Sequence, residues 1–324
     1  MPSVFRPSTP SDGPELTRMA ERLLGVAPES PMFGDAQLSW KYWAPWRSGT
    51  SPRSYVLVRD GRIVAHVAAL SLECRRGART LTLLHPFDWM SEPSAIGAGA
   101  AVLQRLTKLG DGVLIVGGSQ TTQRMVRPLG FRALGDVGCY AARVGTSAAP
   151  ASDATSLGAE LTLSVVTEPT AEVCASVEPP IPWLEALRSP ERLADFLRCP
   201  VAAMSVHAVR RDGALLGGFL LAKVPGQARI AAFWAARDAH DLPALLGASR
   251  RHAASHAGVS EVVSMANLPA ERAALEAAGF RQTGSVPSFL LTRATELDAD
   301  TAFAFQMIDG DVAFLHHGAP QPWL

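Results

Sequence analysis

Two acidic side chains stand on one apolar stretch of the chain, where they could remove a proton from a nucleophile. Asp88 and Glu92 are carboxylates, and a carboxylate can act as a general base directly or through a water molecule. Alternate residues of a strand share a face, so we expect Asp88, Met90 and Glu92 to lie together. Asp88 is the first candidate for the base and Glu92 the second. Asp88 could instead pair with an arginine, and Glu92 could be an exposed loop carboxylate.

A run of small residues follows these carboxylates and is typical of an anion site. Gly97 and Gly99 let the backbone approach a ligand closely, and the run from Val102 to Leu106 has the apolar spacing of a helix. The first N–H groups of a helix point outward at the positive end of its dipole. The sequence therefore predicts a strand, a small-residue loop and a helix whose start binds an anion such as a pyrophosphate.

Further strands and helices must surround this loop to hold it in place. Asp60-Gly61 joins two strand-like runs and is a hairpin signal. A second short helix ends at Gly130-Phe131 and is followed by a last strand. The expected strands are residues 54–59, 62–73, 112–117 and 137–144, and the expected second helix is 121–129.

This order of elements, over about residues 4–145, resembles the GNAT superfamily of N-acyltransferases. In that family a Gln/Arg-x-x-Gly-x-Gly/Ala turn after the fourth strand holds the pyrophosphate of acyl-CoA, and the closing helix ends in Gly-Phe. The residues that match the turn are Ile96, Gly97, Ala98, Gly99, Ala100 and Ala101. The resemblance implies acetyl-CoA or another acyl-CoA as donor, bound by these residues together with Met90, Ser91, Ser119 and Gln120.

The sequence departs from the family pattern at two positions. Ile96 stands where the family usually has Arg or Gln, which removes a side-chain donor and leaves the backbone amides. Val126 stands four residues before the Gly of Gly-Phe, where the family often has a Tyr that protonates the leaving thiolate. The resemblance therefore implies a weakened CoA site without that general acid.

The second half of the chain repeats the pattern of the first. The run from His207 to Phe219 parallels the run from Tyr55 to Ala65, because both are strand, Asp-Gly turn and strand. A long helix, a strand, a short helix and a second Gly-Phe follow. No glycine pair precedes the long helix, and Asp238 and Asp241 would repel a phosphate there. The second copy is therefore expected to be degenerate.

We expect an α+β fold with two tandem GNAT-like domains, each a mixed, mostly antiparallel central sheet flanked by helices. The first domain is expected at residues 1–145 and the second at 159–324. Residues 146–158 are small, polar and without period, which predicts a linker. Tandem chains of this plan resemble bacterial acyltransferases.

Three aromatic residues after the first helix could form the acceptor side of the site. Trp40, Tyr42 and Trp43 could stack on a sugar or cover an apolar acceptor. They could equally be a hydrophobic plug over the sheet. The tail from Phe303 to Phe314 could lie back across a groove, or be a solvated turn at Asp309-Gly310-Asp311.

Composition limits the possible partners. Thirty basic and thirty acidic residues give zero formal net charge, and no basic run indicates nucleic-acid binding. No apolar run is long enough to span a bilayer and no signal peptide is recognised, which favours a cytoplasmic protein without membrane contact. The four cysteines are read as free thiols. His252 and His256 lack a third ligand, so no metal is expected. A monomer or a homodimer is expected.

These observations lead to one main hypothesis and two alternatives. The main hypothesis is an N-acyltransferase that moves an acetyl or other acyl group from acyl-CoA to a primary amine of a small metabolite or amino-sugar. The first alternative is a non-catalytic acyl-CoA-binding or interaction protein. The second is a Fem-type aminoacyl transferase, which the neutral charge and the Gly99-x-Ala101 turn disfavour.

Overall fold

A computed structural model describes residues 3–47, 52–76, 79–144, 161–179, 182–294, 297 and 300–323. The chain divides into two compact units. Unit 1 comprises Met1–Gly135 and Pro287–Ala302, and unit 2 comprises Asp136–Val286 and Phe303–Leu324. The linker predicted at 146–158 lies outside the described residues.

Unit 1 contains the first repeat of the sequence. Its helical elements are α1 (Gly13–Leu24), α2 (Asp35–Leu38), the π-helical turn η3 (Ser39–Trp43), α3 (Ala98–Leu106) and α4 (Gln120–Val126), with short 3-10 turns η1 (Pro10–Asp12) and η2 (Pro31–Phe33). Its strands are β1 (Val4–Pro7), β2 (Ser54–Arg59), β3 (Arg62–Arg76), β4 (Arg79–Ser91), β5 (Gly112–Val116) and the later part of β13 (Arg281–Thr292).

The sheet of unit 1 follows the predicted order of strands. β1, β2, β3 and β4 pair antiparallel in sequence, and β5 then joins β4 in parallel. Asp60 and Gly61 have φ of 51° and 75°, the left-handed pair that a two-residue hairpin turn requires. The hairpin prediction is confirmed.

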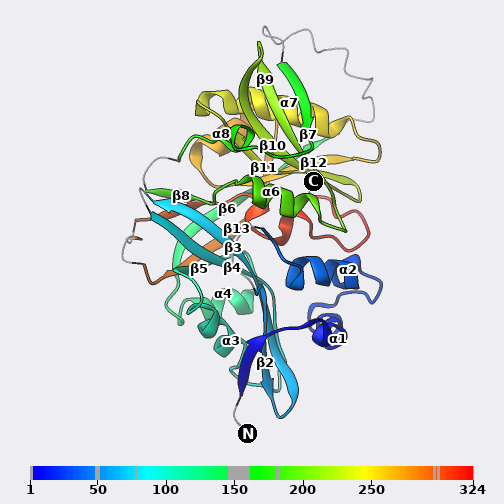
Figure 1. The fold of residues 1–324 in the computed structure, drawn as a ribbon, viewed down its shortest axis with the longest axis vertical. Coiled ribbons are helices and arrows are strands. Elements are labelled where there is room, and N and C mark those ends of the chain that lie inside the picture. Colours follow the sequence, from blue (N-terminus) through cyan, green and yellow to red (C-terminus); the bar gives the residue numbers. More distant parts are fainter. Residues whose placement is uncertain are drawn as a thin grey trace. The chain divides into compact units, whose positions relative to one another are not determined.

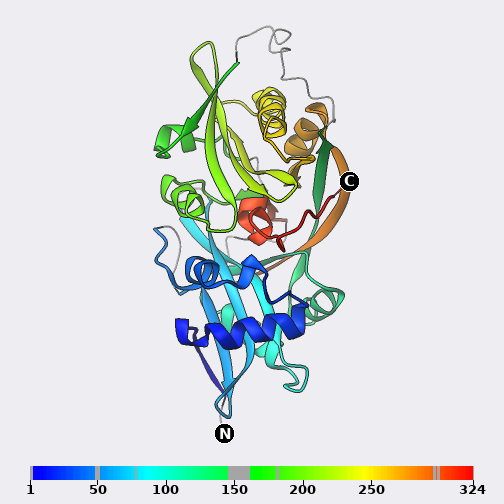
Figure 2. The same cartoon turned by 90° about the vertical axis from the view of Figure 1, so that its right-hand side faces the viewer.

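Helices cover both faces of this sheet. α1 and η3 lie on one face, and α3 and α4 lie on the other (Figures 1 and 2). The core under α3 contains Val102, Leu103 and Leu106 from the helix, packed against strand residues such as Val67 and Val113. The apolar spacing of the helix thus faces the sheet, as its amphipathic sequence predicts.

Unit 2 contains the second repeat. Its strands are β7 (Leu161–Val166), β8 (Trp183–Glu185), β9 (Ala203–Arg211), β10 (Ala214–Val224), β11 (Gln227–Ala235), β12 (Glu261–Ala266) and β14 (Ala302–Ala304). Its helices are α5 (Ala171–Cys174), α6 (Pro190–Leu197), α7 (Leu242–Ala254) and α8 (Pro269–Ala277), with 3-10 turns η4 (Ala239–Asp241), η5 (Met307–Asp309) and η6 (Asp311–Ala313).

The main sheet of unit 2 has the same plan as that of unit 1. The order is β7, β9, β10, β11 and β12, antiparallel except that β12 joins β11 in parallel. Asp212 and Gly213 repeat the left-handed hairpin turn, with φ of 50° and 81°. The internal repeat predicted from the sequence is present.

The last strand of each repeat completes the sheet of the other unit. β6 (Arg132–Arg143) follows the first repeat, but its later part pairs antiparallel with β12 in unit 2. β13 follows the second repeat, but Ser288–Thr292 pair antiparallel with β5 in unit 1. The compact units therefore differ from the continuous stretches 1–145 and 159–324 expected from the sequence. The reason is that the last strand of each repeat pairs within the unit formed by the other repeat.

Candidate functional site

The two middle strands of the unit 1 sheet separate after a short paired stretch. In the described register, β4 meets β5 at Leu83 with Gly112 and at Leu84 with Val113. His85 follows, and its Nδ1 donates to the carbonyl oxygen of Leu114 at 3.0 Å. Burial lowers the pKa of His85 to about 4, against the opposing effect of this hydrogen bond, so the ring is neutral. A neutral, packed His85 thus marks the point where the strands part.

β4 carries a bulge just beyond this point. The register between β3 and β4 shifts between residues 87 and 90. Asp88 has a φ of 44°, a left-handed conformation that non-glycine residues seldom adopt. Consecutive residues Phe87 and Asp88 both contact Tyr42, which shows that the alternation of side chains is broken here. The bulge therefore directs the Asp88 carboxylate toward η3.

Asp88 forms a buried ion pair with a residue that the sequence gave no reason to select. Lys41 Nζ and the Tyr42 hydroxyl each donate to Asp88 Oδ2 at 2.6 Å. The Lys41 and Asp88 side chains are only 1% and 7% exposed. Burial raises the pKa of Asp88, but the charge of Lys41 and the two hydrogen bonds outweigh it, so the net pKa is below its usual range. Asp88 is thus an ionised carboxylate with two donors in place.

A chain of hydrogen bonds continues from the Asp88 backbone into the core. His66 Nδ1 is 2.9 Å from the Asp88 carbonyl oxygen, and His66 Nε2 is 2.8 Å from Ser54 Oγ. Ser8 donates to Ser54 at 2.6 Å, and the Trp43 indole donates to Ser8 at 2.9 Å. The indole only donates and the carbonyl only accepts, so a neutral His66 that is protonated on Nδ1 and accepts from the Ser54 hydroxyl on Nε2 gives every group in the chain a partner.

The pKa of His66 agrees with this assignment. The pKa of His66 is about 4. Burial and, to a smaller degree, the Lys41 charge lower it, while the Asp88 charge and the hydrogen bond to the Asp88 carbonyl oppose the shift. Neither His66 nor Lys41 was a candidate from the sequence. A lone histidine on an apolar strand and a lysine between aromatic residues were the only signals.

Glu92 is the more accessible of the two candidate bases. Its Oε1 accepts from Arg22 of α1 at 2.5 Å, and its side chain remains 25% exposed. Asp88 and Glu92 thus reach partners on η3 and α1, which cover the same face of the sheet. Met90 is buried, and Ser91 lies against α3, where a Cβ on Gly99 would come within 2.9 Å of Ser91 Oγ.

The small-residue loop leads into α3 as predicted. Gly97 is the N-cap, with a left-handed φ of 79°, and Ala98 begins the helix. Among the described residues, no hydrogen-bond acceptor meets the N–H of Gly99 or of Ala100, whereas the Ala101 N–H donates to Gly97 at 2.9 Å. Ile96 is 91% exposed and offers no polar group. The backbone alone therefore presents donors at the start of α3.

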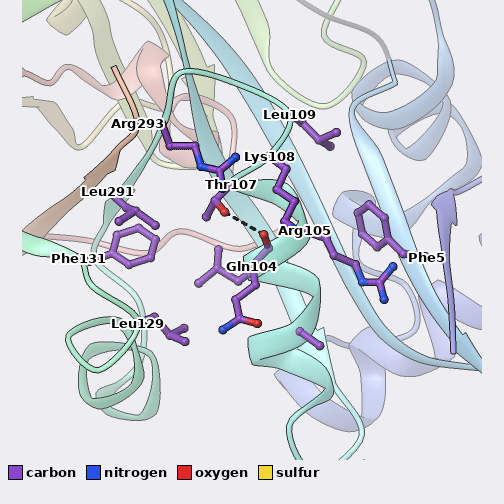
Figure 3. A pocket seen from close by; sticks show the side chains of 12 residues that line it. Phe5, Gln104, Arg105, Thr107, Lys108, Leu109, Leu129, Phe131, Leu291 and Arg293 are labelled. Carbon is purple, nitrogen blue, oxygen red and sulfur yellow. Dashed lines mark hydrogen bonds between the residues drawn. The ribbon is translucent and has the colours of Figure 1, made fainter. Parts of the chain in front are cut away.

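A cavity of about 730 Å³ lies along the outer side of α3. Figure 3 shows Phe131 and Leu291 together on one side of the helix, while Arg105 extends toward Phe5 on the other. The Arg105 guanidinium carbon lies 5.6 Å from the centre of the Phe5 ring. The positively charged side chains that line the cavity are Arg105, Lys108 and Arg293.

The residues at the end of β5 have local structural roles. Ser119 is the N-cap of α4, and its Oγ accepts from the Thr122 N–H at 3.2 Å. Gln120 is the first residue of α4 and is exposed. Val126 is completely buried in the core of unit 1. The position where the family often has a tyrosine is therefore occupied by a core side chain.

The aromatic residues of η3 are mostly interior. Trp40 is 6% exposed and packs on Trp46 with a ring separation of 5.2 Å, and Tyr42 is 1% exposed. Trp43 is half-buried, and its ring would lie 3.2 Å from a Cβ on Gly13. The hydrophobic-plug interpretation accounts for Trp40 and Tyr42, and Trp43 keeps part of its surface open.

The corresponding places in unit 2 are filled by protein. Asp238 caps η4 by accepting from the His240 N–H, and Asp241 pairs with Arg211 at 3.1 Å. Beyond the stretch of β11 that pairs with β12, the Gln306 side chain bonds both the N–H and the carbonyl of Phe233, at 2.9 and 3.0 Å. Unit 2 thus lacks a glycine loop, and its own C-terminal segment occupies the edge of β11.

That segment is not a solvated turn. Asp309 is 1% exposed and pairs with Arg192 at 3.0 Å, and Asn267 bonds the backbone of Phe303 and Phe305. The alternative of an exposed Asp-rich turn is therefore wrong at Asp309, because the segment packs against unit 2 through these polar contacts.

His252 of α7 and His256, which lies just beyond the end of that helix, belong to an aromatic cluster. His252 lies 4.6 Å from His207 and 4.9 Å from His256 between ring centres. Over the described ranges, no three His, Cys, Asp or Glu side chains are arranged to hold a metal ion. In the same ranges, no helix is both long enough and apolar enough to cross a membrane.

Comparison with models of protein families gives no match, and neither does comparison with curated proteins. Solved structures do match. A GCN5-related N-acetyltransferase from Anabaena variabilis has a TM-score of 0.60 at 11% identity, covering 89% of this chain and 72% of its own. For a putative acetyltransferase from Pyrococcus horikoshii the TM-score is 0.57 at 10% identity, with 98% and 96% covered.

A third similar structure is itself a tandem protein. It is a tandem GNAT protein from the clavulanic acid biosynthesis pathway, with a TM-score of 0.57 at 16% identity, covering 90% of this chain and 99% of its own. Identities this low compare folds and not activities. With the repeated sheets and the loop at α3, they establish that this chain has the tandem GNAT fold.

Proposed function

We propose that unit 1 binds an acyl-CoA and transfers its acyl group to a primary amine of a small metabolite or amino-sugar. The observation that carries this proposal is the start of α3, where two backbone N–H groups stay open next to Ser91, in the part of β4 beyond its pairing with β5. Open N–H groups at the positive end of a helix dipole favour an anion such as a pyrophosphate.

The backbone must provide most of this pyrophosphate site. Gly97 adopts a conformation that side chains seldom tolerate, and a Cβ there would meet no atom within 4 Å, so the approach is open. Gly99 and Ala100 supply the donors, with Ala98 and Ala101 beside them. Ile96 adds none, which predicts a weaker site than one with an arginine at this position.

The nucleotide end of the donor would lie along the outer side of α3. The cavity there begins at Ala101, next to the proposed pyrophosphate site, and carries the charges of Arg105, Lys108 and Arg293. Guanidinium and ammonium groups suit phosphate oxygens. Leu129, which is only partly buried, adds an apolar surface for the nucleotide base.

The proposed chemistry requires few side chains. The amine nitrogen attacks the thioester carbon, the C–S bond breaks, and the nitrogen gives its proton to a base. Backbone N–H groups of β4 beyond Pro86 would stabilise the oxyanion. Met90 and Ser91, with Ser119 and Gln120 across the opening, would position the thioester arm. We assign the base to Glu92 or to Asp88 through water, and the thiolate takes its proton from solvent because Val126 cannot supply one.

A non-catalytic acyl-CoA-binding role is the second candidate. It is favoured by the commitment of Asp88 to Lys41 and Tyr42, and by the burial of Val126. Both candidates bind acyl-CoA. Release of free CoA thiol in the presence of amines separates them, because only the enzyme turns over.

The test is calorimetric titration of acetyl-CoA and CoA into the wild type and two matched variants. Ala100→Glu places a negative charge at the first turn, where it suits the helix dipole but repels a pyrophosphate, and Ala100→Gln has the same shape without the charge. We expect binding that Ala100→Glu loses and Ala100→Gln keeps. An absence of binding to the wild type would refute the proposed function.

A further inference from the structure

Three arginines converge on a second cavity, in unit 2 and far from α3 in the sequence. The cavity has a volume of about 480 Å³, and its lining is Ala141, Ala142, Arg143, Arg250, Gly279 and Arg281. The arginines come from the end of β6, from α7 and from the start of β13. Among the residues that the structure describes, no carboxylate lines this cavity, and the three arginines give its lining three positive charges.

The three guanidinium groups have no polar partner among the described residues. In the part of the chain that the structure describes, none of Arg143, Arg250 and Arg281 has an ion pair or a side-chain hydrogen bond. Other arginines of unit 2 are engaged: Arg192 pairs with Asp309 and Arg211 with Asp241. The charges of the three cavity arginines are therefore available to an anionic ligand, which would meet no acidic side chain of the described lining.

Gly279 gives one of these arginines its position. Its φ is 85°, and a Cβ there would lie 2.7 Å from Arg250 Nη1. The guanidinium of Arg250 therefore rests directly on the Gly279 backbone, in space that any side chain would take. Arg250 is half-buried, while Arg143 and Arg281 are exposed. One half-buried and two exposed guanidinium groups suit a ligand that enters from solvent.

The lining indicates what kind of ligand fits. Alanine side chains form the apolar part and no aromatic ring lines the cavity, so charge and not ring stacking would provide recognition. An arginine fork matches phosphate oxygens in pairs. Three guanidinium groups offer more hydrogen-bond donors than the oxygens of one phosphate group can accept in pairs. The cavity volume is large enough for two phosphate groups with a substituent.

We propose that this cavity binds a small molecule that carries a pyrophosphate or two neighbouring phosphate groups. The site is separate from the proposed CoA site, because unit 2 has no glycine loop and Gln306 occupies the edge of β11. The proposal therefore does not depend on CoA binding to unit 1, and either can fail without the other.

The experiment is calorimetric titration of inorganic pyrophosphate and of ADP at low ionic strength. The variants are Arg250→Gln and Arg281→Gln, and the matched control is Arg251→Gln, which removes the same charge from the next residue of α7 outside the cavity. We expect each cavity variant to weaken one binding event about tenfold or more, as the loss of a charge-assisted hydrogen bond does. The control should keep wild-type affinity.

The two ligands distinguish the source of the phosphate groups. Tighter binding of ADP than of pyrophosphate would support a nucleotide, and equal binding would support recognition of the diphosphate alone. No saturable binding of either ligand, or equal weakening by Arg251→Gln, would overturn the site. Tighter binding of single-stranded RNA, with a steeper salt dependence than three charges explain, would overturn the small-molecule assignment. CoA also carries a pyrophosphate, so the control is limited to the unit 1 site: the CoA binding event that Ala100→Glu removes should persist unchanged in both cavity variants.

Discussion

Lys41 Nζ lies 2.6 Å from Asp88 Oδ2 inside unit 1, and water reaches almost nothing of either side chain. The Nζ also lies 4.2 Å from the centre of the Phe33 ring. Desolvation of both charges offsets much of their attraction, so the pair adds little net stability. Loss of one partner, by contrast, leaves the other charged, buried and unpaired.

We therefore expect Lys41→Met to lower the free energy of unfolding by about 3–5 kcal/mol. Asp88→Asn should also destabilise, and the double variant should be much more stable than the sum of the two effects implies. Urea unfolding measures all four proteins. The more exposed pair of Arg6 and Asp12 is the control, since Arg6→Met should cost only about 1 kcal/mol. Additive effects at Lys41 and Asp88 would contradict this account.

The neutral histidines predict acid sensitivity. The pKa of His66 and of His85 is about 4 in the fold, below the value of about 6.5 in an unfolded chain. Between these values the unfolded chain binds more protons, so the free energy of unfolding falls as pH falls, by about 1.4 kcal/mol per pH unit for each histidine. His85→Asn keeps a donor for Leu114 and should have a shallower slope. An unchanged slope between pH 6 and about 4.5 would show that His85 is not the source.

Glu271 in unit 2 predicts the opposite dependence. It is fully buried, with Gln306 Nε2 bonded to its Oε1 at 2.5 Å. Burial raises the pKa of Glu271 to about 7, and Arg188 opposes the shift. A raised pKa stabilises the fold below the unfolded value of about 4.3 and loses that effect as pH rises toward 7. Glu271→Gln should therefore be more stable than the wild type at pH 8, by about 1–3 kcal/mol, and no different near pH 4. Lower stability at pH 8 would contradict this.

Substitution of Glu92 should affect the activity of the protein much more than its stability. Glu92 is partly exposed and bonded to Arg22, so Glu92→Gln should change the free energy of unfolding by less than about 1 kcal/mol. If Glu92 is the base, the same variant should lower kcat by about 100-fold or more, with KM for acyl-CoA little changed. Arg22→Gln is the control for loss of the ion pair alone. Full activity of Glu92→Gln would transfer the assignment to Asp88 or to water.

The stoichiometry of CoA should be one per chain. Unit 1 offers open N–H groups at α3, whereas in unit 2 Gln306 bonds the Phe233 backbone and Asp238 stands before α7. In the Arg250→Gln variant, which weakens the separate anion cavity of unit 2, calorimetry should give a single CoA site, and adding Gln306→Ala should not create another. Two equivalent sites in that variant would mean that unit 2 binds CoA without a glycine loop.

Local signals made much of the fold predictable. Asp60-Gly61 and Asp212-Gly213 fix hairpins because few residues accept left-handed backbone in sequence, and both hairpins are present. The small-residue run likewise indicated a helix after it, although α3 begins at Ala98, just after Gly97 and before the apolar run that starts at Val102. Each of these features depends on neighbours in the chain, so no long-range contact had to be known.

The features that could not be predicted from the sequence depend on contacts between residues far apart in the chain. Lys41 is buried only because Asp88, 47 residues away, turns toward it at a bulge. A bulge shifts the alternation of side chains by one residue, and nothing in the sequence of β4 announces it. The exchange of β6 and β13 was equally invisible, since a strand has the same pattern whichever neighbour it pairs with.

The exchange of β6 and β13 between the two units affects how the chain folds during its synthesis. A nascent chain that has emerged only as far as the middle leaves β5 without the neighbour that Ser288–Thr292 will provide, so a sheet edge stays open during translation. Open edges invite pairing with other chains. In the full chain neither half completes its sheet with its own last strand, so we expect either half expressed alone to be an aggregation-prone fragment.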